Sequence, residues 1–221
     1  SAYVRGASRA YVHRSHSGRY GIVNSEEGFQ NLVRFLFGTV RVGIFLDDVV
    51  LQENEDTDYF VNVSVAIRGL PVLMQEQTLR NYCPIRFETP AARRTPLYTT
   101  FLMPEKSATG DNISRFAITL ALHSARSRKG VFDFENHLEE VPLWSDTLIV
   151  DVGARDRSSG VYPAWCAWVS EGYGPKYMKR LPMTDHPDNR EMSQSKVALP
   201  ERGRTVAGKS AHLTFDTSFW D

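Results

Sequence analysis

Two histidines, His13 and His16, stand three residues apart in the segment YVHRSHSG, just before a glycine-containing turn. A loop histidine can act as a general base because its unperturbed pKa lies near neutrality. His16 lies in SHSG, where small neighbours leave the ring accessible, whereas His13 continues an apparent strand, AYVH. We therefore expect His16 to be the catalytic residue if this segment is catalytic. The alternative is that both histidines are polar loop residues that bind backbone carbonyls.

Two other polar segments contain residue types that can bind metals. In LDDVVLQENEDTD, Asp56 and Asp58 are two residues apart, as the ligands of a calcium loop are. The glycine and the final glutamate of an EF-hand are missing, so a solvated hairpin loop is favoured over a calcium site. TDHPDN groups Asp185, His186 and Asp188, which could bind a metal or form an acid–base pair, although its proline and asparagine are typical of a surface turn. We predict no metal and no cofactor.

Aromatic residues gather in the segment VYPAWCAWVSEGYGPKYM. Trp165 and Trp168 are an odd number of positions apart, so in a regular strand they face opposite sides. One would then belong to the core and the other could contact a sugar, a lipid or another domain, but core packing is favoured for this segment. Cys83 and Cys166 both lie among apolar residues, and buried free thiols are favoured over a single disulfide.

The elements that would position these residues begin with a helix over residues 25 to 37. Asn24 or Ser25 can cap it, and Asn24 with Glu27 approximates a capping box. Gly38 is expected to end the helix in the left-handed conformation. Four apolar residues form one stripe at helical spacing, namely Phe29, Leu32, Val33 and Leu36. We expect this stripe to dock on the chain's own β domain, on a second copy or on a separate subunit.

After Arg41 the apolar period changes from 3.6 residues to two. Short segments rich in β-branched and aromatic residues follow, separated by turn signals such as ATGDN, SRKG and RSSG. The pattern predicts a mainly β fold, an antiparallel β-sandwich that is jelly-roll-like and has a short N-terminal helical segment. The stretch from residue 179 to 192 is expected to be a long polar loop.

Composition restricts the function classes. The 221 residues have a formal net charge of zero, so no overall field attracts nucleic acid or an anionic membrane. No apolar run approaches the roughly 20 residues that a transmembrane helix needs. Localisation stays open between cytoplasmic and secreted. The sign of the local charge changes just after Gly38, which predicts two parts, residues 1–39 and residues 40–221.

The segment HRSHSGRYGIVNSEEGFQNLVRFLFG resembles the last catalytic segment of lipase-like and esterase-like serine α/β-hydrolases. In that family the final strand delivers a histidine on a loop and the closing helix packs back on the sheet. The resemblance, over residues 10–38, implies that residues 1–39 are the tail of a hydrolase catalytic domain with His16 as the triad base. Residues 40–221 would then be an accessory β-sandwich that binds substrate, lipid or a partner.

The chain departs from that family because it contains no G-x-S-x-G motif and no parallel βαβ units. A histidine base without a serine cannot perform acyl transfer. The resemblance therefore implies a partner, a hydrolase catalytic portion that carries the nucleophile on the same precursor or on a separate subunit, and a lipid or ester substrate. Two alternatives stay open: a non-enzymatic β-sandwich for binding or assembly, and a jelly-roll enzyme with its own site around His186.

Overall fold

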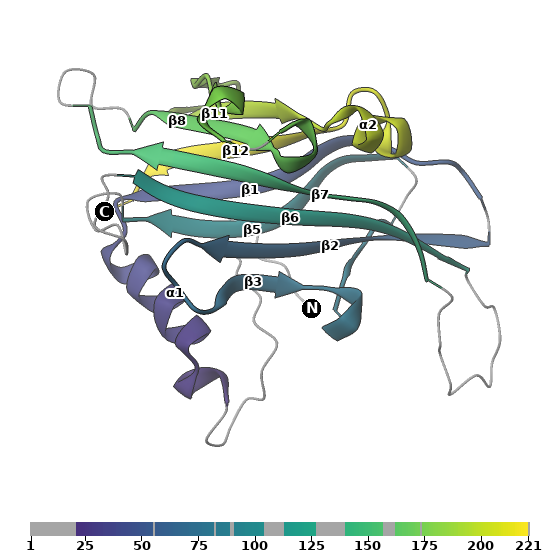
Figure 1. Ribbon diagram of the computed structural model, residues 1–221, viewed down its shortest axis with the longest axis horizontal. Coiled ribbons are helices and arrows are strands. Elements are labelled where there is room, and N and C mark those ends of the chain that lie inside the picture. The colour runs from purple at the N-terminus through teal and green to yellow at the C-terminus, as the bar shows by residue number, and fades with distance from the viewer. Residues whose placement is uncertain are drawn as a thin grey trace.

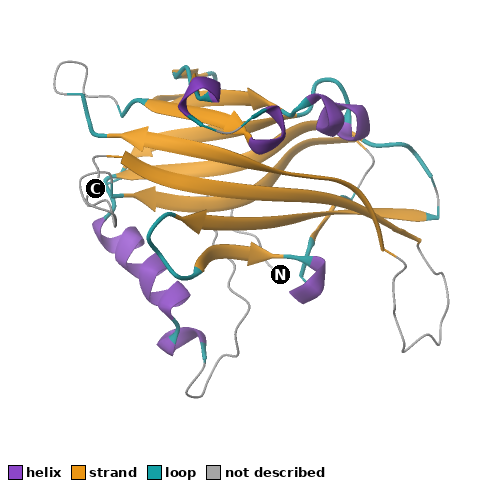
Figure 2. Cartoon of the chain, viewed as in Figure 1, coloured by secondary structure: helices purple, strands orange, loops and turns teal. Residues whose placement is uncertain are grey.

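The computed structural model describes residues 21–54, 56–81, 83–88, 91–103, 113–126, 140–156, 162–172 and 174–220. Its strands form two antiparallel sheets that pack face to face, which confirms the predicted mainly β sandwich with a short N-terminal helix (Figure 1). The helices lie at the periphery of the sandwich (Figure 2). In the part of the chain that the structure describes, no helix is long and apolar enough to cross a membrane.

The first sheet has five strands in the order β10-β11-β12-β1-β5. Their bounds are Thr184–His186 (β10), Asn189–Ala198 (β11), His212–Phe219 (β12), Val40–Val50 (β1) and Ala91–Leu102 (β5). The second sheet has the order β3-β2-β6-β7-β8-β9, and a short strand β4 also pairs with β2. Their bounds are Leu73–Gln77 (β3), Thr57–Ile67 (β2), Ile113–Arg126 (β6), Glu140–Gly153 (β7), Ala164–Trp168 (β8), Lys179–Arg180 (β9) and Ile85–Arg86 (β4).

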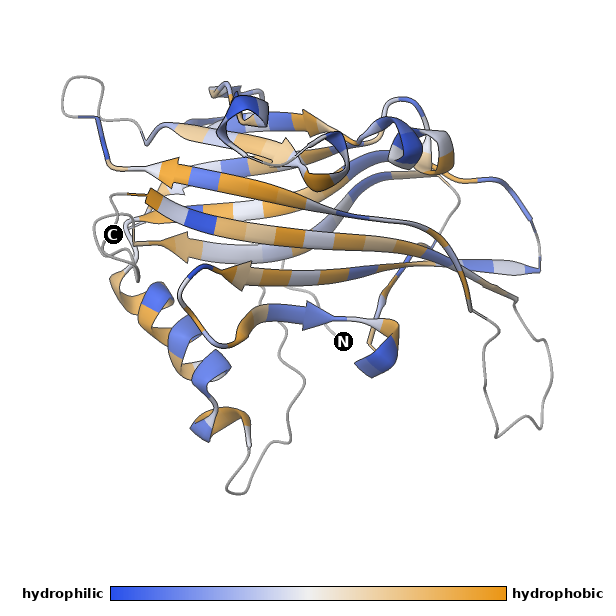
Figure 3. Ribbon diagram, in the orientation of Figure 1, coloured by the Kyte–Doolittle hydropathy of each residue, from blue (hydrophilic) through white to orange (hydrophobic). Residues whose placement is uncertain are grey.

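The core lies between the sheets because successive side chains of a strand point to opposite faces. In β6 the predicted alternation is confirmed, since its inward residues are at most 7% exposed, namely Phe116, Ile118, Leu120 and Leu122. The same pattern brings the first half of β1 inward through Val40, Val42 and Ile44. Figure 3 shows this mixture of apolar and polar positions along the strands.

Helix α1 spans Glu26–Phe37, close to the predicted range, and follows a 3₁₀ turn η1 (Ile22–Asn24). Ser25 is the capping residue, because its Oγ accepts a hydrogen bond of 3.0 Å from the backbone N–H of Gly28. The predicted left-handed conformation of Gly38 is wrong: its φ is −71° and its backbone is extended. Glycine is needed there for space, since a Cβ atom would lie 2.5 Å from the Arg34 carbonyl and 2.6 Å from Phe101 Cβ.

The predicted polar loop at residues 179–192 is also wrong. This stretch contains β9, β10 and the start of β11, and β10 pairs with β11 as Thr184 with Gln194 and Asp185 with Ser193. These strands are polar on both faces, so no apolar alternation marked them in the sequence.

A second helix, α2 (Glu201–Ala207), was not predicted. It covers the end of the sandwich where Gly208 packs on Val50, the last residue of β1. The remaining 3₁₀ turns are η2 (Leu79–Asn81), η3 (Val169–Glu171) and η4 (Pro175–Tyr177).

Candidate ligand-binding pocket

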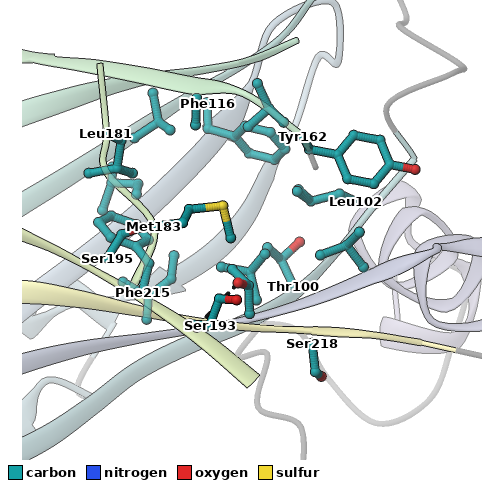
Figure 4. A pocket seen from close by; sticks show the side chains of 18 of the residues that line it. Thr100, Leu102, Phe116, Tyr162, Leu181, Met183, Ser193, Ser195, Phe215 and Ser218 are labelled. Carbon is teal, nitrogen blue, oxygen red and sulfur yellow. Dashed lines mark hydrogen bonds between the residues drawn. The ribbon is translucent and has the colours of Figure 1, made fainter. Parts of the chain in front are cut away.

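A pocket of about 170 Å³ lies between the two sheets, at the end of the sandwich where β1 begins and β12 ends. Its walls come from both sheets and from the segments beside β8 and β9 (Figure 4). The apolar residues of the walls are Val40, Val42, Ile44, Val65, Leu102, Phe116, Ile118, Val150, Val152, Ala164, Leu181, Met183, Phe215 and Phe219. The pocket is therefore an incompletely filled part of the hydrophobic core.

Hydroxyl groups line one side of the pocket. They belong to Thr100 on β5, to Ser193 and Ser195 on β11 and to Thr217 and Ser218 on β12. Ser195 Oγ donates to the Pro182 carbonyl at 2.8 Å, and Thr217 Oγ1 donates to the Ser193 carbonyl at 3.2 Å. These two hydroxyls are thus already held by the protein.

Thr100 differs from Ser195 and Thr217. It is 5% exposed, and its Oγ1 makes no hydrogen bond in the structure, although its side chain is close enough to interact with the Tyr98 hydroxyl. A buried hydroxyl without a partner costs free energy, so such a group indicates a position where a further polar atom can bind. Figure 4 places Thr100 on the wall formed by the five-stranded sheet, across the space from Phe116 on the other sheet.

The pocket opens to solvent beside Met183 and Phe219, which are 39% and 64% exposed. Tyr162 stands at the same end, and its hydroxyl lies 3.3 Å from Thr39 Oγ1. Figure 4 shows the Met183 side chain reaching into the middle of the space. Because methionine is unbranched and flexible, it can move aside to admit a ligand without a change in the backbone.

The chemistry of the lining favours binding over catalysis. Among the described residues that line the pocket, Glu191 supplies the carboxylate and Tyr162 the phenol, and none is a histidine, cysteine, lysine, arginine or aspartate. A nucleophile needs a base within hydrogen-bond reach, and among the described residues no hydrogen bond joins the Glu191 carboxylate to a lining serine or threonine.

The opposite face of the five-stranded sheet carries a polar network around Asp216, which is 6% exposed. Gln194 Nε2 donates to its Oδ1 at 2.9 Å, Arg94 donates to its Oδ2, and His186 Nε2 lies 3.5 Å from the same oxygen. The Arg94 guanidinium also stacks 3.8 Å from the centre of the Phe45 ring. These contacts connect all five strands of the sheet, so the network is a structural clamp across it.

Next to this clamp, Asp47 on β1 lies opposite His212 on the neighbouring strand β12. Asp47 Oδ1 and His212 Nε2 are buried without a hydrogen-bond partner. Burial raises the pKa of the Asp47 carboxyl above its usual value, because the charged form loses solvation.

Of the residues predicted to be functional, those that the structure describes do not line the pocket. His16, the predicted catalytic residue, lies outside the described residues, and so does His13. The serine-hydrolase function and the boundary between residues 1–39 and 40–221 therefore stay predictions.

The predicted surface turn at TDHPDN is confirmed between β10 and β11. His186 Nδ1 accepts from the Asp188 backbone N–H at 3.1 Å, and its Nε2 faces Asp216, so both nitrogens are engaged. Asp58 accepts a hydrogen bond of 2.6 Å from Arg86. In the described ranges, no group of three histidine, cysteine, aspartate or glutamate residues could hold a metal ion.

The aromatic segment divides as its spacing predicted. Trp168 is 3% exposed, donates from Nε1 to the Ala198 carbonyl at 2.9 Å and packs against Trp144, whereas Trp165 is half-buried on the other face of β8. Cys83 and Cys166 are free thiols, as predicted, although only Cys166 is fully buried.

We compared the chain with models of known protein families, with curated proteins and with solved structures, and none of them matches it. The candidate function therefore has to be argued from the pocket.

Proposed function

We propose that this chain is a non-enzymatic β-sandwich module that binds a small, mostly apolar molecule between its two sheets. The observation that carries this proposal is the unpartnered hydroxyl of Thr100 in the wall of an otherwise apolar pocket. Apolar walls supply affinity, and a single polar group orients the ligand, which is the usual composition of small-molecule sites.

The volume of the pocket limits the size of the ligand. About 170 Å³ is close to the roughly 150 Å³ of an apolar cavity that accommodates benzene. The ligand class is therefore one ring, or a branched chain of similar volume, with one hydroxyl or carbonyl group to pair with Thr100. A longer molecule would have to extend past Met183 into solvent.

The proposal is tested by titrating the full chain with toluene, phenol and cyclohexanol and measuring binding by calorimetry. Ala164→Phe fills the pocket from β8, whereas Ala167→Phe places the same ring on the other face of the same strand. We expect binding to be lost in Ala164→Phe and kept in Ala167→Phe. Equal binding by both variants, or no binding of any probe by the unmodified chain, would contradict the proposal.

Thr100→Val tests the role of the hydroxyl, because valine has nearly the same shape. We expect the affinity for phenol and cyclohexanol to fall by about tenfold, the equivalent of one hydrogen bond of about 1.4 kcal/mol. The affinity for toluene, which has no hydroxyl, should not fall. A uniform change for all three probes would assign to Thr100 a packing role only.

A further inference from the structure

Helix α1 contacts the sandwich through a face that is only partly apolar. Asn31 Nδ2 donates to the Met74 carbonyl on β3 at 2.9 Å, and Asn31 Oδ1 accepts from the Tyr98 hydroxyl on β5 at 3.0 Å. Phe35 packs against Phe101 and Trp220, with ring centres 5.3 and 5.4 Å apart. The helix thus lies across the open edge between the two sheets, beside β3 in Figure 1.

Three residues of the apolar stripe point away from the sandwich, and the fourth, Val33, is half-buried. Phe29, Leu32 and Leu36 lie about 100 to 160° around the helix axis from Asn31, because each residue advances by about 100°. They are 57%, 54% and 57% exposed. Of the three surfaces expected for this stripe, the chain's own sandwich is therefore not the one that covers these three residues.

The exposed apolar surface extends beyond the stripe to Val23, which is 82% exposed, and Phe37, which is 65% exposed. With Phe29, Leu32 and Leu36, the patch amounts to an area on the order of 500 Å², since these five side chains are 54–82% exposed and an aromatic side chain presents about 150–250 Å² in full. Two such patches together offer roughly 1,000 Å², the lower limit for a specific protein interface. A patch on the order of 500 Å² matches the largest apolar patch of a typical monomer, and such patches are often functional.

We propose that this patch is a homodimer interface, in which α1 of one chain packs antiparallel against α1 of a second copy around a two-fold axis. The stripe suits its own copy because it is symmetric about the Leu32–Val33 peptide bond. Antiparallel pairing brings Phe29 against Leu36 of the second copy and Leu32 against Val33 of the second copy. Such a self-complementary surface is what a two-fold interface requires, and spacing of three and four residues is the pattern of packed helices.

A membrane surface is a less suitable occupant. Helices that lie on membranes carry many lysine and arginine residues on their polar face. The charged residues of α1 are Glu26, Glu27 and Arg34, which give the helix a net negative charge. Anionic lipid would repel this helix, whereas an uncharged apolar stripe on a second copy would not.

The proposal is tested by measuring the mass of the full chain by light scattering and sedimentation over a wide range of protein concentration. We expect the unmodified chain to reach twice its 25.0 kDa mass. Leu32→Glu and Leu36→Glu should each weaken the dimer by at least about tenfold. Leu32→Glu brings two carboxylates together at the two-fold axis, and Leu36→Glu places a carboxylate against Phe29 of the second copy at each end of the apolar interface. Their circular dichroism should stay that of the unmodified chain, since both side chains are exposed in the monomer.

Val141→Glu is the matched control. Val141 is 54% exposed, as Leu32 is, but it lies on β7 and outside the patch. This variant should dimerise like the unmodified chain. A chain that is monomeric at every concentration, or a dimer that persists in both Leu32→Glu and Leu36→Glu, would overturn the proposal. Equal loss of the dimer in Val141→Glu would also overturn it.

Discussion

At the scale of single residues, two inward-facing positions show how burial changes the chemistry of a side chain. Thr100 keeps a hydroxyl without a partner in the wall of the pocket, which makes it available to a ligand. Cys166, on β8, is buried between the sheets, and burial raises the pKa of its thiol to about 11. Burial thus leaves the hydroxyl available for hydrogen bonding but keeps the thiol protonated and inert.

The state of Cys166 predicts a difference in reactivity between the two thiols. Only the thiolate reacts with a disulfide reagent, and the thiolate of Cys166 forms in quantity only as the pH rises towards 11. In native protein near pH 8 we expect one thiol, the half-buried Cys83, to react much faster than the other. Cys83→Ser should remove the fast phase. Two equally fast thiols in the native chain would show that the core around Cys166 is open to the reagent.

At the scale of elements, α1 closes the edge between the two sheets through one polar side chain. Asn31 links β3 to β5, which belong to different sheets, and it gives the Tyr98 hydroxyl a hydrogen-bond acceptor. Tyr98 is only 2% exposed, so this partner cannot easily be replaced by water. The energetic contribution of Asn31 is therefore larger than its place on a peripheral helix implies.

We predict that Asn31→Ala lowers the free energy of unfolding by about 1–3 kcal/mol, the cost of leaving a buried polar group without a partner. Tyr98→Phe in the Asn31→Ala background should cost much less than Tyr98→Phe alone, because the hydroxyl has already lost its partner. Urea unfolding of the two single variants and the double variant measures this coupling. Strictly additive effects would mean that the hydrogen bond between the two side chains contributes nothing.

The sequence predicted elements wherever a local pattern determines them. The cap at Ser25 and the helical spacing identified α1, and two-residue alternation identified β6, because both signals come from residues near one another in the chain. The hairpin of β10 and β11 was missed because its strands are polar on both faces. The backbone conformation predicted for Gly38 was wrong because the glycine is needed for the close approach of Phe101, a residue distant in the sequence.

At the scale of the whole molecule, the pocket exists only because distant segments meet. Its walls combine the start of β1, the start of β6, the end of β7 and the end of β12, which are far apart in the chain. Ser193 and Ser195 face inward although they are polar, so their residue type does not predict that they line a pocket. No local pattern in the sequence indicates that these faces leave a space between them.

This arrangement predicts that a ligand stabilises the entire fold, because residues of both sheets contact it and an unfolded chain has no such site. A probe present at about 100 times its Kd should add about 2.7 kcal/mol to the free energy of unfolding. For a chain of this length each kcal/mol raises Tm by about 2–4 °C, so cyclohexanol should raise Tm by about 5–10 °C. Thermal melts followed by circular dichroism measure the shift.

Leu32→Glu should show the full shift in Tm, since α1 does not line the pocket, whereas Ala164→Phe should show none. A shift in Ala164→Phe as large as in the unmodified chain would mean that the probe binds elsewhere, and its loss in Leu32→Glu would mean that the exposed helix and the pocket are not independent.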